Sequence, residues 1–187
     1  MTPEPPTIYL FAGCNGAGKT TFARAYLTAG FDTPPRFLNA DEIARGLSPL
    51  TPESVALKAG KLLLSEIDGC LRNLQSFAIE STLSGQAQVG ILTRARILGY
   101  RIEIFYLWIP SSSVAIKRIA QRVKKGGHRI PSKDVERRYS RSLRNFVQFY
   151  APIADVWKVW DNTRRPPTLT LSSAHASLTE LEKLLLP

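Results

Sequence analysis

One segment near the N-terminus combines the residue types that bind phosphate groups. Residues 13–20 read Gly-Cys-Asn-Gly-Ala-Gly-Lys-Thr and match the pattern G-x-x-x-x-G-K-[ST] at every fixed position. Its glycines let backbone N–H groups turn toward an anion, and a helix that begins there adds the positive end of its dipole. In this pattern the lysine reaches the β- and γ-phosphates and the following hydroxyl binds Mg²⁺. We therefore expect a nucleoside triphosphate bound by Gly13, Asn15, Gly16, Ala17, Gly18, Lys19, Thr20 and Thr21, with Thr20 as the metal ligand.

Two later segments place an acidic residue directly after a short apolar run that is typical of a strand. Asp41 comes shortly after Arg36–Leu38, and Glu80 follows Phe77–Ile79. Ligands of open α/β sheets lie at the carboxyl ends of the strands, so both carboxylates are candidates for the site. Asp41 has an alternative interpretation, because its position also suits the cap of the next helix.

A strongly basic block occupies residues 117–144. It holds eleven Lys or Arg residues against two acidic residues, and so carries +9 of the formal net charge of +10. In its middle, residues 126–131 read Gly-Gly-His-Arg-Ile-Pro, a loop between two helical patterns. This layout is typical of a lid that closes over phosphates. A solvated helix face or an RNA contact would carry the same charge.

The framework that must position these residues is an alternation of strands and helices. Helical patterns separate five apolar runs that are typical of buried strands, at 8–12, 36–38, 77–79, 101–109 and 154–160. We predict an α/β fold of the P-loop NTPase and kinase type, with three layers, a mainly parallel five-stranded sheet and a helical lid at about 122–141. The C-terminal segment 164–187 would add a closing helix and, if 168–171 pairs, a sixth strand at the edge.

Periodicity and capping signals predict local boundaries. A helix from Thr51 to about Asn73 should bury Val55, Leu62, Leu63, Ile67, Cys70, Leu71 and Leu74. Ser81 or Ser84 could cap the helix at 86–98, and Ser132 should cap a helix over 133–149. In that last helix, core-like spacing is shown by Tyr139, Phe146 and Phe149.

The length and composition of the chain limit the classes of protein to which it can belong. At 187 residues the chain fits one domain, 1–187, with a short flexible tail at 1–6. No apolar run approaches the roughly 20 residues that span a bilayer, and the N-terminus lacks the regions of a signal peptide. One of only two cysteines, Cys14, lies in the phosphate loop, so we expect a reduced, cytoplasmic setting and no membrane partner. The run 101–109 ends at Pro110 without an acidic residue, which favours a small kinase over a motor ATPase.

With these residues in view, the sequence resembles the zeta toxin family of P-loop kinases. The resemblance covers residues 8–163, and its ordered combination of segments is more specific than the phosphate loop alone. The matching segments are 13–21, Asn39-Ala40-Asp41, 77–84, 122–131, 137–146 and Asp161-Asn162-Thr163.

The resemblance implies ATP- and Mg²⁺-dependent phosphorylation of a hydroxyl. In characterised members the acceptor is the 3′-hydroxyl of the amino sugar in UDP-N-acetylglucosamine. The implied roles are Asp41 as the base, Asn162 at the nucleotide, and Glu80, Ser81 and Thr82 at the acceptor. Lys19 and two lid arginines would neutralise the transferring phosphoryl group: Arg122, and one of Arg129, Arg137 and Arg138.

The resemblance implies a nucleotide sugar as substrate, and any antitoxin would come from a separate chain. One rival is a kinase for another small metabolite, an antibiotic or a nucleic-acid end. The other is an RNA-binding ATPase, although the basic block lacks an RNA-recognition signature and an interleaved stacking platform, so nucleic acid is not the expected partner.

Overall fold

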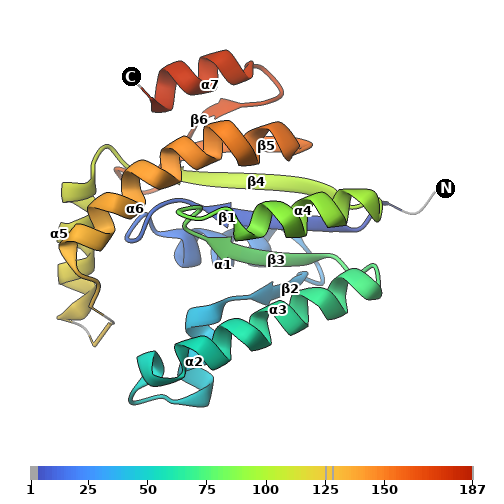
Figure 1. The fold of residues 1–187 in the computed structure, drawn as a ribbon. Helices are drawn as coiled ribbons and strands as arrows, with labels where there is room; N and C mark the ends of the chain where they lie inside the picture. Colours follow the sequence, from blue (N-terminus) through green and yellow to red (C-terminus); the bar gives the residue numbers. More distant parts are fainter. Residues whose placement is uncertain (1–3, 125, 128, 187) are drawn as a thin grey trace.

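The strands of the chain form one mainly parallel sheet. A computed structural model describes residues 4–124, 126–127 and 129–186. Within these residues, six strands pair in the order β2-β3-β1-β4-β5-β6, and only β6 runs antiparallel to its neighbour (Figure 1). The strands are β1 (Thr7–Ala12), β2 (Arg36–Leu38), β3 (Phe77–Ser81), β4 (Arg101–Trp108), β5 (Val156–Asp161) and β6 (Thr168–Ser172). The predicted fold class is confirmed, and the C-terminal segment does supply the sixth strand.

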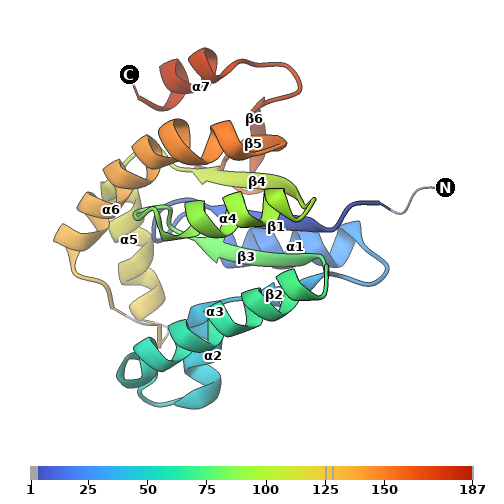
Figure 2. The same cartoon turned by 45° about the vertical axis from the view of Figure 1, so that its right-hand side comes forward.

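Helices cover both faces of this sheet. They are α1 (Lys19–Gly30), α2 (Ala40–Leu47), α3 (Ala56–Arg72), α4 (Ala87–Ile97), α5 (Ser112–Val123), α6 (Ser132–Asn145) and α7 (Leu178–Leu185). Figures 1 and 2 show α4 and α6 across one face and α1 on the opposite face. Of the helices in the described ranges, none combines the length and the apolar character that crossing a membrane requires. Residues 1–3 of the predicted flexible tail lie outside the described residues.

Alternate residues of the central strands pack into two separate cores. In β1, Ile8 and Leu10 join the cluster that α3, α4 and α7 cover, whereas Phe11 joins the cluster under α1 and α5. Phe11 also stacks on Phe105 of β4, with ring centroids 5.1 Å apart. Because side chains alternate along a strand and both faces are covered, these strands are continuous apolar runs. The pairing of Ala12 with Ser81 brings the carboxyl ends of β1 and β3 side by side.

The helix predicted from Thr51 to Asn73 is divided in the structure. A 3₁₀ turn spans Pro52–Val55 and α3 begins at Ala56. The predicted burial of Leu62 and Leu74 was wrong, since these side chains are 38% and 55% exposed. Leu74 lies beyond the last helical residue, with a φ of 51°, so the helical period no longer applies to it.

The second lid helix also differs from its prediction. Pro131 rather than Ser132 occupies the N-cap, and no side chain caps α6. After Asn145 the chain continues as a π-helical turn, which advances the register of the following residues. As a result Phe146 is fully buried, while Phe149, which we predicted on the same buried face, is 37% exposed.

The side chain of Phe146, at the start of this turn, packs against the sheet. Phe146 stacks on Tyr106 of β4, with ring centroids 4.3 Å apart, and both rings are buried. We expect Phe146→Ala to lower the free energy of unfolding by about 3–5 kcal/mol, because it leaves a cavity in the core. Urea titration measures the change, and Phe149→Ala in the same turn is the control, with an expected loss below about 1 kcal/mol. Similar losses in both variants would show that the stacked pair does not hold α6 to the sheet.

Candidate active site

A cleft of about 1390 Å³ collects most of the predicted site residues. It is lined by residues that follow β1, β2 and β5, by the end of β3, and by the lid. The predicted residues in its wall are Asn15, Gly16, Gly18, Lys19, Thr20, Thr21, Asp41, Glu80, Arg122, Arg129 and Asn162. Segments that are more than 100 residues apart in the sequence therefore face one another across a single space.

The phosphate loop has the strand–loop–helix geometry that its sequence predicts. It leaves β1 at Ala12, and α1 begins at Lys19. Gly13 has a φ of 135°, and a Cβ there would lie 2.4 Å from the carbonyl oxygen of Leu107, so no other residue fits. The Lys19 Nζ donates a hydrogen bond to the Cys14 carbonyl across the loop, at 3.2 Å. Burial raises the pKa of the Cys14 thiol to about 11, so this cysteine is a packing residue rather than a nucleophile.

Asp41 lies in the first turn of α2 and lines the cleft. The cap of this helix is Asn39, whose side chain accepts hydrogen bonds from the backbone N–H groups of Asp41 (2.8 Å) and Glu42 (3.3 Å). The interpretation of Asp41 as the helix cap was therefore wrong. The neighbouring Glu42 forms an ion pair with Arg24 of α1 at 2.5 Å.

Glu80 faces the phosphate loop from the end of β3. Burial raises the pKa of Glu80, while Lys19 and the nearby Thr20 side chain act in the opposite direction. The Glu80 Oε1 is buried and has no hydrogen-bond partner among the described residues. A carboxylate with a vacant acceptor beside a hydroxyl fits the oxygen ligands that Mg²⁺ prefers.

Ser81 and Thr82 are the predicted acceptor residues that the structure leaves out of the cleft wall. The Ser81 hydroxyl accepts a hydrogen bond from the Leu83 N–H (3.1 Å), and the Thr82 hydroxyl bonds that of Ser84 (2.8 Å). These bonds shape the turn after β3. Neither Ser81 nor Ser84 caps α4, whose N-cap is Gln86, so that alternative was wrong. Acceptor binding by Ser81 and Thr82 stays a prediction.

The lid arginines separate into three positions. Arg122 and Arg129 line the cleft. Arg138 lies outside its wall but donates to the Asn15 Oδ1 at 3.4 Å. Arg137, by contrast, pairs with Asp134 at 2.7 Å and is 50% exposed. Of the three candidates for the second lid arginine, Arg129 is the one that lines the cleft, and its role stays a prediction.

Gly127 packs directly against the backbone that carries Arg122. Its N–H donates to the Arg122 carbonyl at 3.0 Å, and a Cβ on Gly127 would lie 2.5 Å from the Arg122 Cγ. The loop therefore needs glycine here to keep the Arg122 side chain in place. His128, which we predicted in the lid, lies outside the described residues.

Comparison with known proteins identifies the family. The family model described as Zeta toxin matches residues 1–164. The chain belongs to the zeta toxin family. This membership confirms the resemblance on which the sequence interpretation rested, and it makes the chain a kinase.

This zeta toxin family member is also similar to individual proteins. An uncharacterized protein of Haemophilus influenzae is 30% identical over 129 residues, which are 69% of this chain and 89% of that protein. A chain from the structure of the PezAT chromosomal toxin–antitoxin system of Streptococcus pneumoniae has a TM-score of 0.73 at 14% identity, over 99% of this chain and 80% of that one. A chain of the AvrRxo1-ORF1:-ORF2 complex with ATP has a TM-score of 0.67 at 18% identity, over 96% and 63%. At such identities the two structures show a shared fold.

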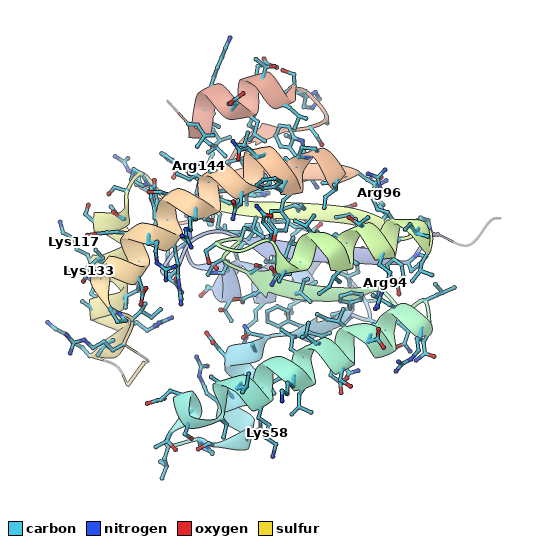
Figure 3. The ribbon with its side chains drawn as sticks, in the orientation of Figure 1. Lys58, Arg94, Arg96, Lys117, Lys133 and Arg144 are labelled. Carbon is cyan, nitrogen blue, oxygen red and sulfur yellow. The ribbon has the colours of Figure 1, made fainter. Side chains whose placement is uncertain are left out.

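Much of the basic block in this zeta toxin family member lies away from the cleft. Figure 3 shows Lys117 and Lys133 on the outer side of α5 and α6, and Arg144 further along α6. Among the described Lys and Arg residues of the block, only Arg118, Arg122 and Arg129 line the cleft. The charge of the block is therefore a poor guide to the site.

Four arginines of the cleft were missed by the sequence analysis: Arg24, Arg45, Arg118 and Arg165. A helical spacing links two of them to predicted site residues. Arg118 lies four residues before Arg122 on α5, and Arg45 lies four residues after Asp41 on α2. Residues four apart share one face of a helix, so this spacing is the signal that could have found both. The Arg118 guanidinium is fixed by the carbonyl oxygens of Asn162 (2.7 Å) and Thr163 (3.0 Å).

Proposed function

We propose that this kinase transfers the γ-phosphate of ATP to a hydroxyl of a small acceptor that binds beside Asp41. The observation that carries the proposal is that Lys19, Asp41 and the lid arginines line one cleft, although they come from three distant segments. Sites for a single small molecule usually measure about 300–1,000 Å³. A cleft of about 1390 Å³ has room for a nucleotide and a second substrate side by side.

Each residue has a role that phosphoryl transfer requires. Asp41 accepts the proton of the attacking hydroxyl. Lys19 and the N–H groups of the phosphate loop hold the phosphates, while Arg122 and Arg129 stabilise charge on the transferring group. Because the transition state is loose, catalysis depends on positioning and charge stabilisation. Closure of the lid also excludes water, which would otherwise compete as the acceptor.

Thr20 and Glu80 would hold the Mg²⁺ ion that accompanies ATP. When bound, the ion neutralises charge on the β- and γ-phosphates. The Thr20 hydroxyl and the unpartnered Glu80 Oε1 support this assignment. In this assignment Glu80 binds the metal instead of the acceptor for which it was predicted. Asp41 is then the principal contact for the acceptor hydroxyl.

For the acceptor, we propose the 3′-hydroxyl of the amino sugar in UDP-N-acetylglucosamine, on the strength of family membership. The test is transfer of ³²P from γ-labelled ATP to a panel of UDP-N-acetylglucosamine, UDP-glucose and RNA with a free 5′-hydroxyl. We expect label on the first and much less on the others, with the position of the phosphate read by NMR. Preferential labelling of RNA ends would replace the sugar nucleotide with a nucleic-acid acceptor and keep the kinase chemistry.

We extend the proposal to a protein inhibitor on a separate chain. The support is family membership and the likeness to a structure from a toxin–antitoxin system. Co-expression with the protein of an adjacent reading frame should relieve growth arrest that the kinase causes alone. Growth arrest that a Lys19→Ala variant also causes would contradict toxicity through phosphoryl transfer.

The lid prediction separates kinase chemistry from RNA binding. Arg122→Lys keeps the charge but loses the planar fork that can hold a phosphate through two hydrogen bonds. We expect turnover to fall at least about tenfold, or about 1.4 kcal/mol of transition-state stabilisation. Lys124→Ala and Lys133→Ala, which lie outside the cleft wall, should change turnover less than about twofold. Turnover and RNA affinity are measured for all three variants at two salt concentrations.

An RNA-binding surface would respond differently. Arg→Lys would be nearly silent there, each Lys→Ala would weaken binding, and affinity would fall steeply with salt. Tight, salt-sensitive RNA binding with uniform losses across the three variants would overturn the lid interpretation.

A further inference from the structure

Asn162 joins three segments of the active site at one buried point. It directly follows β5 and is only 7% exposed. Its backbone N–H donates to the Trp108 carbonyl at 2.9 Å, and its backbone carbonyl accepts from Arg118 at 2.7 Å. Its side-chain Nδ2 donates to the carbonyl oxygen of Ala17 at 2.6 Å. The end of β4, the lid helix α5 and the phosphate loop are therefore all held by this residue.

The bond to Ala17 has a consequence for the loop that carries the phosphates. The peptide between Ala17 and Gly18 is trans and planar, so its C=O and N–H point in opposite directions. Fixing the Ala17 oxygen on Asn162 turns the Gly18 N–H away from Asn162. Ala17 is fully buried, whereas Gly18 lines the cleft, and within the described residues the Gly18 N–H makes no backbone hydrogen bond.

We propose that Asn162 is a positioning residue that sets the phosphate loop for ATP, by holding the Ala17 carbonyl so that the Gly18 N–H faces the phosphates. The inference rests on the proposed ATP binding. It differs from the sequence-based prediction that Asn162 contacts the nucleotide directly, since one amide N–H of Asn162 is engaged with the loop itself.

The same contact explains the glycine at position 18. Gly18 has a φ of 92°, in the left-handed region, and a Cβ there would lie 2.4 Å from the Asn162 Nδ2. A side chain at this position would therefore be strained and would also displace the amide. Gly18 and Asn162 form a matched pair: the glycine leaves the space that the amide needs to reach Ala17.

The inference is tested by replacing the amide with an apolar side chain that has the same number of heavy atoms. Asn162→Leu should weaken the affinity of the full-length protein for Mg²⁺–ATP at least about tenfold in titration calorimetry, or about 1.4 kcal/mol. The control is Ser142→Ala, which breaks a different buried hydrogen bond, between the hydroxyls of Ser142 and Tyr106 at 2.9 Å, outside the cleft wall. This control should lower stability but leave ATP affinity unchanged.

A spectroscopic measurement on the unaltered protein makes the test independent of folding in the variant. In ¹H–¹⁵N spectra, addition of Mg²⁺–ATP should move the Gly18 backbone amide downfield, while the Asn162 side-chain amide signals stay in place. The reverse pattern would overturn the inference in favour of direct nucleotide contact by Asn162.

The remaining outcomes separate this inference from the proposed function. ATP affinity that Asn162→Leu leaves unchanged overturns the inference while kinase chemistry stands. An equal loss of affinity in Ser142→Ala assigns the effect to general destabilisation and also overturns it. Unaltered protein that binds no Mg²⁺–ATP defeats the proposed function and the inference with it.

Discussion

Lys19→Ala should reduce phosphoryl transfer about 10³-fold while the protein remains folded. Lys19 is the one lysine of the cleft wall among the described residues, and its Nζ donates a hydrogen bond to the Cys14 carbonyl across the loop. Removing one preorganised electrostatic donor typically costs about 10²–10³ in rate, and Lys19 carries a full charge, which places it at the upper end. The loss corresponds to about 4 kcal/mol of transition-state stabilisation. Turnover is measured with saturating ATP and the acceptor found in the labelling panel.

The matched control for this variant is Lys133→Ala. Lys133 is also a lysine in the first turn of a helix, but Figure 3 shows it on the outer side of the lid. Its loss should change turnover less than about twofold, and urea titration should show both variants folded. Turnover of folded Lys19→Ala near the wild-type level would mean that phosphoryl transfer occurs somewhere other than this loop.

The parts of the site that could be predicted from sequence are those that depend on local structure. The phosphate loop needs only a strand, a glycine-rich turn and a helix in immediate succession, and residues 7–30 form them. Asp41 and Glu80 were nominated because Glu80 lies at the end of a strand and Asp41 shortly after one, in a sheet with one ligand-binding edge. The order of the strands is set by pairing between distant segments, such as β1 with β4, which no local pattern records.

The parts that could not be predicted depend on contacts between distant segments. The Asn162 amide reaches Ala17 across 145 positions of sequence, and nothing in the run Asp161-Asn162-Thr163 indicates that its donor is engaged there. Ser81 and Thr82 have the residue types of a binding site, but their hydroxyls stabilise the turn after β3. The residue types at a strand end therefore indicate which side chains are candidates for binding a ligand. The hydrogen bonds in the structure show which of these side chains are already engaged in a turn.

Charge was the least informative signal. The block at 117–144 carries +9, which suggested a surface devoted to phosphates or RNA. Its outward residues are distributed around α5 and α6, while three arginines turn to the cleft. Helical geometry explains the division, because a helix with a cation at nearly every turn must present some of them to solvent. The spacing of Arg118 and Arg122 indicates the functional face better than the total charge does.

Asp41→Asn should retain ATP binding and lose about 10²–10⁴-fold in phosphoryl transfer. The amide is nearly isosteric with the carboxylate but cannot accept the proton of the attacking hydroxyl, and positioned bases contribute rate factors of this size. Because Asn39 caps α2, the substitution removes no capping hydrogen bond. The cost in stability is limited to the favourable interaction of the acid with the helix dipole, about 0.3–1 kcal/mol. Single-turnover transfer and the ATP dissociation constant are measured on the same preparation.

Glu42→Gln is the matched control, because it removes a carboxylate one residue further along the same helical turn. The Glu42 side chain is engaged in the 2.5 Å ion pair with Arg24, so it is poorly placed to accept a proton from the acceptor. We expect its turnover to stay within about threefold of wild type, since an exposed ion pair contributes less than about 1 kcal/mol. If Glu42→Gln instead shows the large loss and Asp41→Asn the small one, Glu42 is the base. Unchanged transfer in both variants would remove the α2 carboxylates from the chemistry, and the proposed mechanism would then lack its proton acceptor.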